Sequence, residues 1–201
     1  MANFYVSDLH FGHENIIKLC KRPFSNVDEM NEVLIKKWNE KVTNGDTVYI
    51  IGDLFFRSAT DSCEVLKRLK GKKHLIIGNH DKSWLPKMGK DDIAKYFESV
   101  SHMQVINTNK GIATLCHYPM MSFEGSFLIH GHIHNNTKNA PYWPLLSKMD
   151  DAYNASVEIN GYAPVTFDEL AANNKEWKET CELAGMLHGE HEKITDKGDG
   201  T

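Results

Sequence analysis

The sequence has little of what marks a membrane protein, a disulfide-rich protein or a basic nucleic-acid-binding protein. It has no long apolar run, and residues 1–9 lack a basic stretch followed by an apolar one, so we expect neither a signal peptide nor a membrane span. The four cysteines are widely spaced without a Cys-x-x-Cys pair, which argues against a thiolate zinc site and a dense disulfide framework. We therefore expect a cytoplasmic protein in a reducing compartment.

The charge balance disfavours one class of partner. The formal net charge is -4 and no long basic run occurs, so the sequence carries no electrostatic footprint for long duplex DNA. A mildly acidic chain can still process phosphate, because bound metal ions supply positive charge that residue counts omit. No feature of the sequence points to a protein partner.

Length and composition indicate one globular domain. The chain has 201 residues, of which 41% are hydrophobic and 25% charged, and this is ordinary for a domain with a sizeable core. We place the domain at residues 1–187. Residues 188–201 are polar and end in glycine and charge, so we expect them to form a disordered tail.

Apolar periodicity predicts strands that alternate with helices in the first half of the chain. Residues 28–42 form the clearest helix, with apolar side chains at helical spacing and with Ser25 or Asn26 as its N-cap. Alternation of this kind favours an α/β fold, and the closely spaced later strands favour some antiparallel pairing. The other expected elements are a short helix from residue 14, helices at 61–70, 93–100 and 167–187, and strands at 4–6, 47–51, 74–77, 103–106, 112–116, 127–130 and 156–159.

Five short polar clusters stand where predicted strands end. In open α/β sheets, ligand sites form outside the carboxyl ends of the strands, and loops held by such a scaffold can bring distant residues together. We therefore expect these clusters to converge. They are Asp8-x-His10, Gly52-Asp53, Gly78-Asn79-His80-Asp81, His117 and Gly131-His132-x-His134.

The residue types in these clusters suit divalent metal ions. Carboxylate, imidazole and amide oxygen together are typical ligands of Mn, Fe, Zn or Ni. Asp8 and His10 are separated by one residue, and on an extended segment such residues point to the same side, so both can reach one ion. His132 and His134 repeat this spacing. The neighbouring glycines let the backbone turn sharply beside the ions.

The order D-x-H, G-D, G-N-H-D, H, G-H-x-H resembles that of the calcineurin-like metallophosphoesterases. The match spans roughly residues 3–165, and although each fragment is weak alone, all five in order after plausible strands form a specific pattern. The resemblance implies an α/β fold, a metallophosphoesterase-like β-sandwich of two mixed sheets flanked by helices. It also implies a dinuclear metal-dependent phosphoesterase, for which we expect manganese, with iron, zinc, nickel or magnesium as alternatives.

The resemblance also implies which residues hold the two ions. Two divalent ions about 3.5–4 Å apart can clamp the attacking and leaving oxygens of an in-line displacement, with a bridging hydroxide as the nucleophile. The implied ligands are Asp8, His10 and His134 for the first metal, Asn79, His117 and His132 for the second, and Asp53 as the bridge between them.

Further residues are expected to serve the substrate. The resemblance implies that His80 contacts the substrate phosphate and can protonate the leaving oxygen, and that Asp81 orients His80. Arg57 follows Asp53 by four residues, a spacing at which some family members place a phosphate-binding arginine. A planar guanidinium suits bidentate contact with phosphate. His13, at the start of a predicted helix, could also reach the cleft.

Several of these residues have ordinary structural explanations as well. Asp8 and Asp53 could each cap a following turn, Asp81 could be only a turn residue, and Arg57 could be a solvated surface arginine. Capping explains any one cluster, but it does not explain five clusters in a fixed order.

Other features are expected to be structural. For His13 and His130 we favour structural roles, and we expect the aromatic residues of 123–143 to pack under a long loop. The Arg22-Pro23-Phe24 segment looks like a feature of small bacterial and phage members of the family, but the sequence offers no physical account of it.

Three functions compete on the sequence alone. They are a phosphoesterase acting on phosphomonoesters or phosphodiesters, a non-catalytic metal-binding interaction scaffold of the same fold, and a metal-storage or regulatory protein. The presence of His80 together with every expected ligand favours the phosphoesterase. Since the chain is short and has no obvious cap domain, we expect an open site that takes nucleotides, cyclic nucleotides or nucleic-acid ends.

Overall fold

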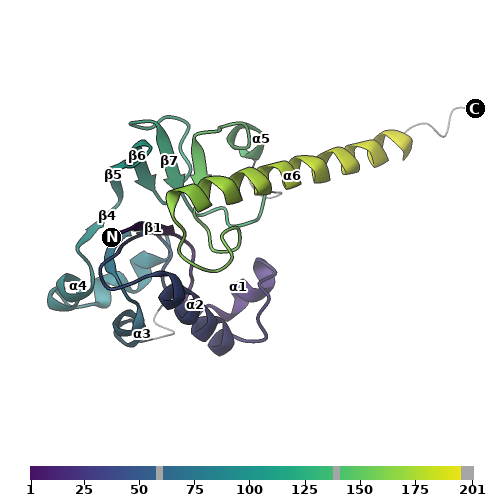
Figure 1. The fold of residues 1–201 in the computed structure, drawn as a ribbon. Helices are drawn as coiled ribbons and strands as arrows, with labels where there is room; N and C mark the ends of the chain where they lie inside the picture. Colours follow the sequence, from purple (N-terminus) through teal and green to yellow (C-terminus); the bar gives the residue numbers. More distant parts are fainter. Residues whose placement is uncertain (58–60, 138–140, 196–201) are drawn as a thin grey trace, which may run out of the picture.

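Two four-stranded sheets form the centre of the computed structural model, which describes residues 1–57, 61–137 and 141–195, with side chains described as far as residue 183 (Figure 1). All strand pairs of the first sheet are parallel, in the order β1-β2-β3-β4. In the second sheet, β5 and β6 pair antiparallel, whereas β6-β7 and β7-β8 are parallel. The strands are β1 (Asn3–Val6), β2 (Thr47–Ile51), β3 (Lys72–Ile76), β4 (Ser99–Ser101), β5 (Met103–Thr108), β6 (Gly111–Cys116), β7 (Phe127–His130) and β8 (Ala152–Asn154).

Most of the described helices connect consecutive strands of the first sheet. Of the others, α5 lies between β7 and β8, and α6 follows β8. Two short 3-10 turns, Asp81–Ser83 and Leu85–Lys87, come directly after the loop that leaves β3. The α-helices are α1 (Glu14–Leu19), α2 (Val27–Lys41), α3 (Ser62–Arg68), α4 (Lys90–Tyr96), α5 (Trp143–Leu146) and α6 (Phe167–Thr195).

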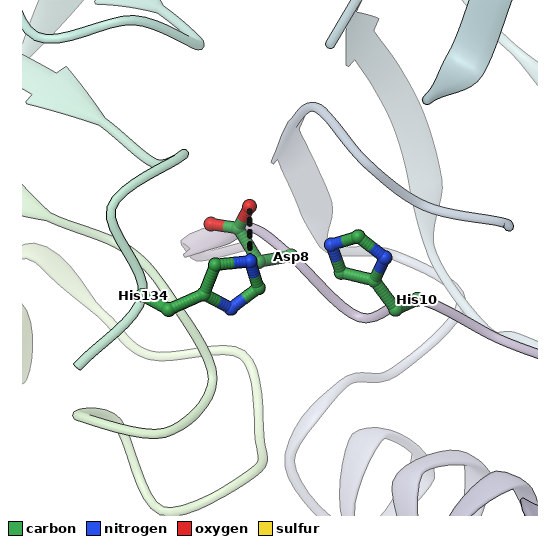
Figure 2. A group of neighbouring side chains, drawn as sticks. All are labelled: Asp8, His10 and His134. Atoms are coloured by element: carbon green, nitrogen blue, oxygen red, sulfur yellow. Dashed lines mark ion pairs between the residues drawn. The ribbon is translucent and has the colours of Figure 1, made fainter. Parts of the chain in front are cut away.

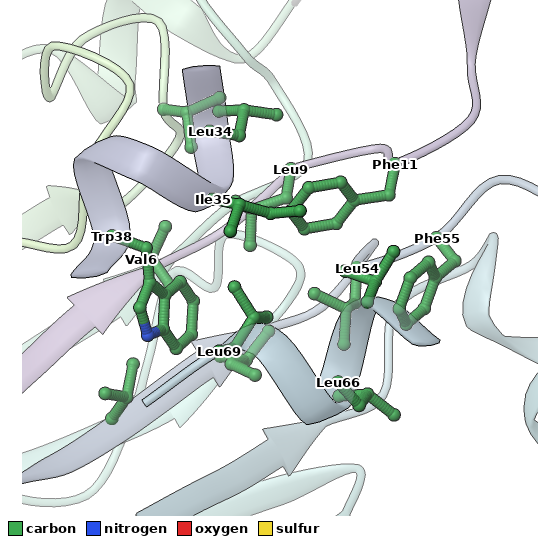
Figure 3. Close-up of a cluster of buried hydrophobic side chains, with 14 of the residues drawn as sticks. Val6, Leu9, Phe11, Leu34, Ile35, Trp38, Leu54, Phe55, Leu66 and Leu69 are labelled. Atoms are coloured by element: carbon green, nitrogen blue, oxygen red, sulfur yellow. The ribbon is translucent and has the colours of Figure 1, made fainter. Parts of the chain in front are cut away.

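Alternate residues of the first sheet pack into two different cores. Val6, Val48 and Ile50 face a cluster that also holds Leu34 and Trp38 of α2, part of which is drawn in Figure 3. On the other side, a second cluster joins the two sheets; its members include Tyr5, Ile51 and Ile76 of the first sheet and Leu115 and Ile129 of the second. Because strands of the first sheet are covered on both faces, their carboxyl ends are held rigidly at one edge. This edge carries the polar loops.

Most sequence expectations for these elements agree with the structure. The predicted α/β sandwich of two sheets flanked by helices is confirmed, although the first sheet is wholly parallel rather than mixed. The strands expected at 47–51 and 127–130 have those bounds. Of the two candidate caps of α2, Asn26 acts as the N-cap: its side chain accepts a hydrogen bond from the Glu29 N–H.

Two expected elements differ from the structure. The helix expected at 93–100 ends at Tyr96, because Ser99–Ser101 pairs with β3 as the strand β4. The strand expected at 156–159 is a turn, in which the Ile159 N–H bonds the Ser156 carbonyl, and the strand β8 lies just before it at Ala152–Asn154. In both cases sheet pairing, which a local pattern does not reveal, decides the structure.

The final helix is longer than expected. Thr166 and Glu169 form a capping box at its start, and α6 continues to Thr195, so it overlaps the tail that we expected at 188–201. Residues 196–201 lie outside the described residues, and disorder of the tail stays a prediction. Figure 1 shows α6 projecting away from the two sheets. No helix in the described part of the chain has the length and apolar character that crossing a membrane requires.

The capping assignment can be tested by substitution. We expect Asn26→Ala to lower the free energy of unfolding by about 1 kcal/mol, because the Glu29 N–H loses its acceptor. The neighbouring Ser25→Ala is the matched control and should have little effect. Urea unfolding followed by circular dichroism measures both; equal stability of the two variants would contradict the assignment.

Candidate metal centre

The five polar clusters converge at the edge where strands of both sheets end. The segments that leave β1 and β2 run side by side, with the Asp8 N–H bonded to the Gly52 carbonyl and the His10 N–H to the Asp53 carbonyl, both at 3.0 Å. The segments after β6 and β7 are joined by a 3.0 Å bond from the Gly131 N–H to the His117 carbonyl. Side chains more than a hundred residues apart are thereby brought within a few ångströms of each other.

Neighbouring side chains leave no room for a Cβ at the glycines of this site. A Cβ on Gly78 would overlap the Oδ1 atom of Asp53, and one on Gly131 would lie 2.6 Å from Oδ2 of Asp8. These glycines are therefore required because carboxylates occupy the space beside them. Five of the candidate ligands themselves adopt a left-handed backbone, with φ between 50° and 73°: Asp8, His10, Asp53, His132 and His134.

The first predicted group of ligands is assembled in the structure. Asp8, His10 and His134 offer ligand atoms that lie within 4.8 Å of one another, and Figure 2 shows the three side chains meeting from two separate segments. Nε2 of His134 lies 3.7 Å from Oδ1 of Asp8. The Asp8 carboxylate is wholly buried and also accepts a 2.6 Å hydrogen bond from the Ser156 hydroxyl.

The second predicted group meets around the amide of Asn79. Its Oδ1 lies 3.1 Å from Nε2 of His117 and 3.0 Å from Nδ1 of His132. Nδ1 of His117 lies 2.9 Å from the carbonyl of Ile51, which can only accept, so this nitrogen carries the proton. The lone pair of Nε2 is therefore directed at Asn79 and at the centre of the site.

Asp53 lies between the two groups, as its predicted bridging position requires. Its Oδ2 is 3.5 Å from Nε2 of His10 on one side and 3.5 Å from Nε2 of His117 on the other. Its Oδ1 accepts a 2.8 Å hydrogen bond from the backbone N–H of His80. One carboxylate thus faces both sets of imidazoles.

The candidate ligands fit divalent cations, and one buried nitrogen among them supports this. Nε2 of His10 is buried and has no hydrogen-bond partner among the described residues, although it lies beside a carboxylate. Buried polar atoms are almost always satisfied, so such an atom marks a place for a further ligand or ion. Imidazole nitrogens, carboxylates and an amide oxygen together match borderline divalent metals.

The electrostatics of the site favour the entry of positive charge. Burial raises the pKa of Asp53 to about 7; His117 opposes this rise, and the charges of Asp8 and Asp81 add to it. Burial alone would lower the pKa of His134, but the Asp8 charge and hydrogen bonds to Cys20 and Glu158 raise it to about 11. Both shifts bring protons to a buried group of carboxylates, and cations would meet the same need.

His80 lies at the open edge of this group. Its side chain is 36% exposed, and its Nε2 is 3.9 Å from Oδ2 of Asp53, so it borders the site without being enclosed by it. Burial on its inner side lowers the pKa of His80, although the Asp81 charge opposes this effect. The imidazole therefore favours its neutral form, which retains one N–H donor.

The Asp81 carboxylate is bound by the loops of the site. It accepts four hydrogen bonds, which use the acceptor positions of both oxygens. The donors are the backbone N–H groups of Asp53, Leu54 and Gly78 and the indole of Trp84, at 2.8 to 3.0 Å. Asp81 therefore fixes the two loops that carry Asp53 and Asn79, and it is a structural anchor of the site. Its expected role in orienting His80 stays a prediction.

Arg57 lies at the rim, outside the group of candidate ligands. It is exposed, and its guanidinium lies 5.0 Å above the Phe56 ring, which in turn is 5.2 Å from the ring of His80. The next residues, 58–60, lie outside the described residues. Contact between Arg57 and phosphate stays a prediction.

His13 is closer to the site than the sequence suggested. It is buried, its Nδ1 lies 3.2 Å from Nδ1 of His10, and its ring stacks on Phe56 with centroids 3.5 Å apart. One of these two nitrogens must donate to the other, so His13 fixes the orientation of His10. The spacing His10-x-x-His13 was the available signal. His130, by contrast, is buried beside the Gly131 carbonyl, in keeping with a structural role.

Sequence patterns did not identify two charged residues that contact the candidate ligands or their segments. Glu158 accepts a 2.9 Å hydrogen bond from Nδ1 of His134, and Arg22 pairs with Glu158. In the sequence, Arg22 stands out only as part of the Arg22-Pro23-Phe24 segment. Glu158 lies in an apolar stretch and belongs to no recognisable motif. A single carboxylate flanked by Val157 and Ile159 was the only signal.

A cavity of about 490 Å³ opens beside the candidate ligands. Its lining includes the histidines His10, His80 and His134 together with several apolar side chains. The aromatic segment 123–143 is divided between two roles: Phe123 and Trp143 pack in a satellite core, as expected, whereas Tyr142 lines this cavity. The apolar and aromatic residues that line it are Ile16, Leu19, Ile133 and Tyr142.

Comparison with known proteins shows one family and several relatives without a described function. A family model described as calcineurin-like phosphoesterase matches residues 4–189. MJ1445, an uncharacterized protein of Methanocaldococcus jannaschii, is 39% identical over 170 residues, which cover 82% of this chain and 86% of that protein. The gene 66 protein of Mycobacterium phage D29 is 27% identical over 162 residues, covering 67% and 80%. The solved structure of AQ665, a protein of unknown function from Aquifex aeolicus, is similar with a TM-score of 0.64 and 26% identity, covering 83% of this chain and 96% of that one.

The tight packing at Gly78 gives a test of the site that does not depend on activity. In Gly78→Ala the new methyl group displaces Asp53, so we expect the affinity for Mn²⁺ to fall by at least about tenfold. Isothermal titration calorimetry measures the affinity, and circular dichroism checks the fold. Gly45→Ala is the control, because its methyl group meets nothing closer than 3.9 Å. Unchanged affinity in a folded Gly78→Ala protein would contradict the site.

Proposed function

The chain belongs to the calcineurin-like phosphoesterase family, and on that premise we propose that it hydrolyses phosphomonoesters or phosphodiesters with the help of two divalent metal ions. The observation that carries the proposal is the buried Nε2 of His10, which lies 3.5 Å from Asp53 and has no hydrogen-bond partner among the described residues. An ion between these two side chains would satisfy both. Members of this family bind divalent metals, so the donor set has a ready explanation.

The proposed ligands divide into two groups that share one carboxylate. Two bound cations would supply Lewis-acid activation of water and would neutralise charge at the phosphoryl group. Asp53 is the proposed shared ligand because it faces imidazoles on both sides. The other proposed ligands are Asp8, His10 and His134 for one ion and Asn79, His117 and His132 for the other.

Hydrogen bonds within the chain fix the orientation of two of these imidazole rings. The Ile51 carbonyl fixes the protonated nitrogen of His117, and the Glu158 carboxylate does the same for His134. In each case the outer nitrogen donates, so the inner nitrogen is the one that faces the site and would bind an ion. This arrangement supports metal binding by neutral imidazoles without rotation of their rings.

His80 is the proposed contact to the reacting phosphate. It is partly exposed to the cavity, and its backbone N–H already bonds Asp53, so its imidazole is held beside the proposed ions. As a neutral imidazole it can donate one N–H to a phosphoryl oxygen or to the leaving oxygen. Asp81 supports this placement indirectly, by fixing the loop on which His80 stands.

The cavity supports small substrates with one apolar or planar group. Its histidines suit the phosphate, and Ile16, Leu19 and Tyr142 in its lining suit a flat or apolar substituent. A nucleotide or a nucleic-acid end combines both features. The net charge of -4 argues against long duplex DNA as the substrate.

The metal and the compartment are further parts of the proposal. Mixed nitrogen and oxygen donors make manganese our first choice, with iron, zinc, nickel or magnesium as alternatives. All four cysteines, which lie in the described residues, are free thiols, and this suits the reducing cytoplasm that we propose as the location.

The role of His80 predicts a dependence on the leaving group. We expect His80→Ala to bind Mn²⁺ as the unaltered protein does but to lower kcat by about 10²- to 10⁴-fold on an alkyl phosphate, whose leaving oxygen needs a proton. The loss should be smaller with p-nitrophenyl phosphate, because p-nitrophenolate leaves without help.

The control for this prediction is His102→Ala, which removes an exposed histidine just before β5 and should leave both rates unchanged. Steady-state kinetics on the two substrates provide the comparison. Equal rates of His80→Ala and the unaltered protein on both substrates would rule out the proposed contact.

The phosphoesterase activity itself is tested with p-nitrophenyl phosphate and bis(p-nitrophenyl) phosphate. With added Mn²⁺ we expect turnover of at least one ester, and Asp53→Asn should greatly weaken both metal binding and activity because the shared carboxylate is lost. If neither ester is hydrolysed with any of the metals named above, the proposal fails and the alternative, a non-catalytic metal-binding interaction scaffold, is favoured.

A further inference from the structure

A buried ion pair joins two segments that are far apart in the sequence. Nη2 and Nε of Arg22 lie 2.7 and 3.0 Å from Oε1 of Glu158, and the two side chains are 0% and 1% exposed. Burying two charges removes them from water, and their attraction offsets this cost only partly, so such a pair is weak support for stability. Its position beside the candidate ligands suggests a different purpose.

The other donors of Arg22 hold the backbone of the first ligand segment. Nη2 donates to the Asp8 carbonyl at 2.6 Å, and Nη1 donates to the Leu9 carbonyl at 2.9 Å. These two carbonyls lie between Asp8 and His10, which both have a left-handed backbone. Since this conformation is unfavourable for residues other than glycine, the segment needs external hydrogen bonds to keep it. The guanidinium supplies them.

Glu158 holds the third ligand of the same group. The oxygen that binds Arg22 also accepts the hydrogen bond from Nδ1 of His134 at 2.9 Å. A carboxylate only accepts, so Nδ1 donates to Glu158 while Nε2 faces Asp8, 3.7 Å away, and Nε2 would bind an ion in exchange for its own proton. A carboxylate behind a metal-binding histidine fixes its ring and strengthens it as a ligand.

We propose that Arg22 and Glu158 are positioning residues for one ion of the pair. A single buried ion pair fixes the backbone that presents Asp8 and His10 and, at the same time, the ring of His134. Of the ligands of the other ion, His117 is held by the Ile51 carbonyl, and His132 contacts Asp8 through its backbone N–H and not through its ring, so the pair acts mainly on one ion. This inference rests on the metal centre of the proposed function, and it gives the Arg22-Pro23-Phe24 segment a physical role.

The inference predicts a loss of affinity at one site only. In Glu158→Gln the amide still accepts from His134, but the negative charge is lost. In calorimetric titration of the full chain with Mn²⁺, we expect the Kd of one site to rise about 10- to 100-fold while the other changes by less than about threefold. A purely structural role would weaken both sites together, because a loosened fold affects all ligands.

A second variant distinguishes a loss of positioning from a loss of folding. Glu158→Gln leaves the Arg22 charge buried without its partner, so the double variant Arg22→Met/Glu158→Gln removes both charges and keeps the side-chain volumes similar. It should show the same selective loss at one site. Glu32→Gln is the matched control, because Glu32 pairs with Arg68 on the exposed surface, and it should bind two ions like the unaltered protein.

The outcomes separate this inference from the proposed function. If the unaltered chain binds two Mn²⁺ ions and the folded double variant binds both with the same affinities, the positioning role is wrong while the metal centre stands. If the unaltered chain binds no Mn²⁺, the metal centre and the positioning role fail together. Selective loss of one ion in both variants supports the inference, even if no ester is hydrolysed.

Discussion

Backbone strain, held in place by buried hydrogen bonds, is the constraint on which the site depends. Five candidate ligands, beginning with Asp8 and His10, adopt a left-handed backbone that is unfavourable by about 1–3 kcal/mol for each residue other than glycine. The loops keep this conformation because buried groups bind them from behind. Asp81 accepts from the Asp53 and Leu54 N–H groups, and Arg22 donates to the Asp8 and Leu9 carbonyls. The ligands are therefore oriented by the fold and do not have to be gathered by an ion.

The two-sheet architecture explains how such strain is tolerated. The first sheet is covered on one face by the core of α1, α2 and α3 and on the other by the second sheet, so its strands cannot shift to relieve the loops. The loops after β6 and β7 are joined to each other, and His132 donates its N–H to the Asp8 carboxylate across the boundary between the sheets. The site is thus formed where both sheets end, and the proposed bridging carboxylate of Asp53 lies at their junction.

The sequence predicted the fold class and the convergence of the five polar clusters, because both depend on short patterns at the ends of apolar strands; the roles of these side chains as metal ligands stay a prediction. The sequence did not predict the roles of residues whose contacts are with residues far away in the chain. Glu158 meets Arg22 across 136 positions and has no local signal, and the partners of Asp81 are set by how two loops pack. The strand β4 was missed for the same reason: its pairing with β3 overrides the local helical pattern.

The central claim is that Asp53 is shared by two ions, one in each group of ligands. A crystal structure of the Mn²⁺-loaded protein, with anomalous diffraction at the manganese edge, tests it most directly. We predict two anomalous peaks about 3.5–4 Å apart, one beside Asp8 and His134 and one beside Asn79 and His132, with the Asp53 carboxylate contacting both. A single peak, or two peaks too far apart for Asp53 to contact both, would contradict the account.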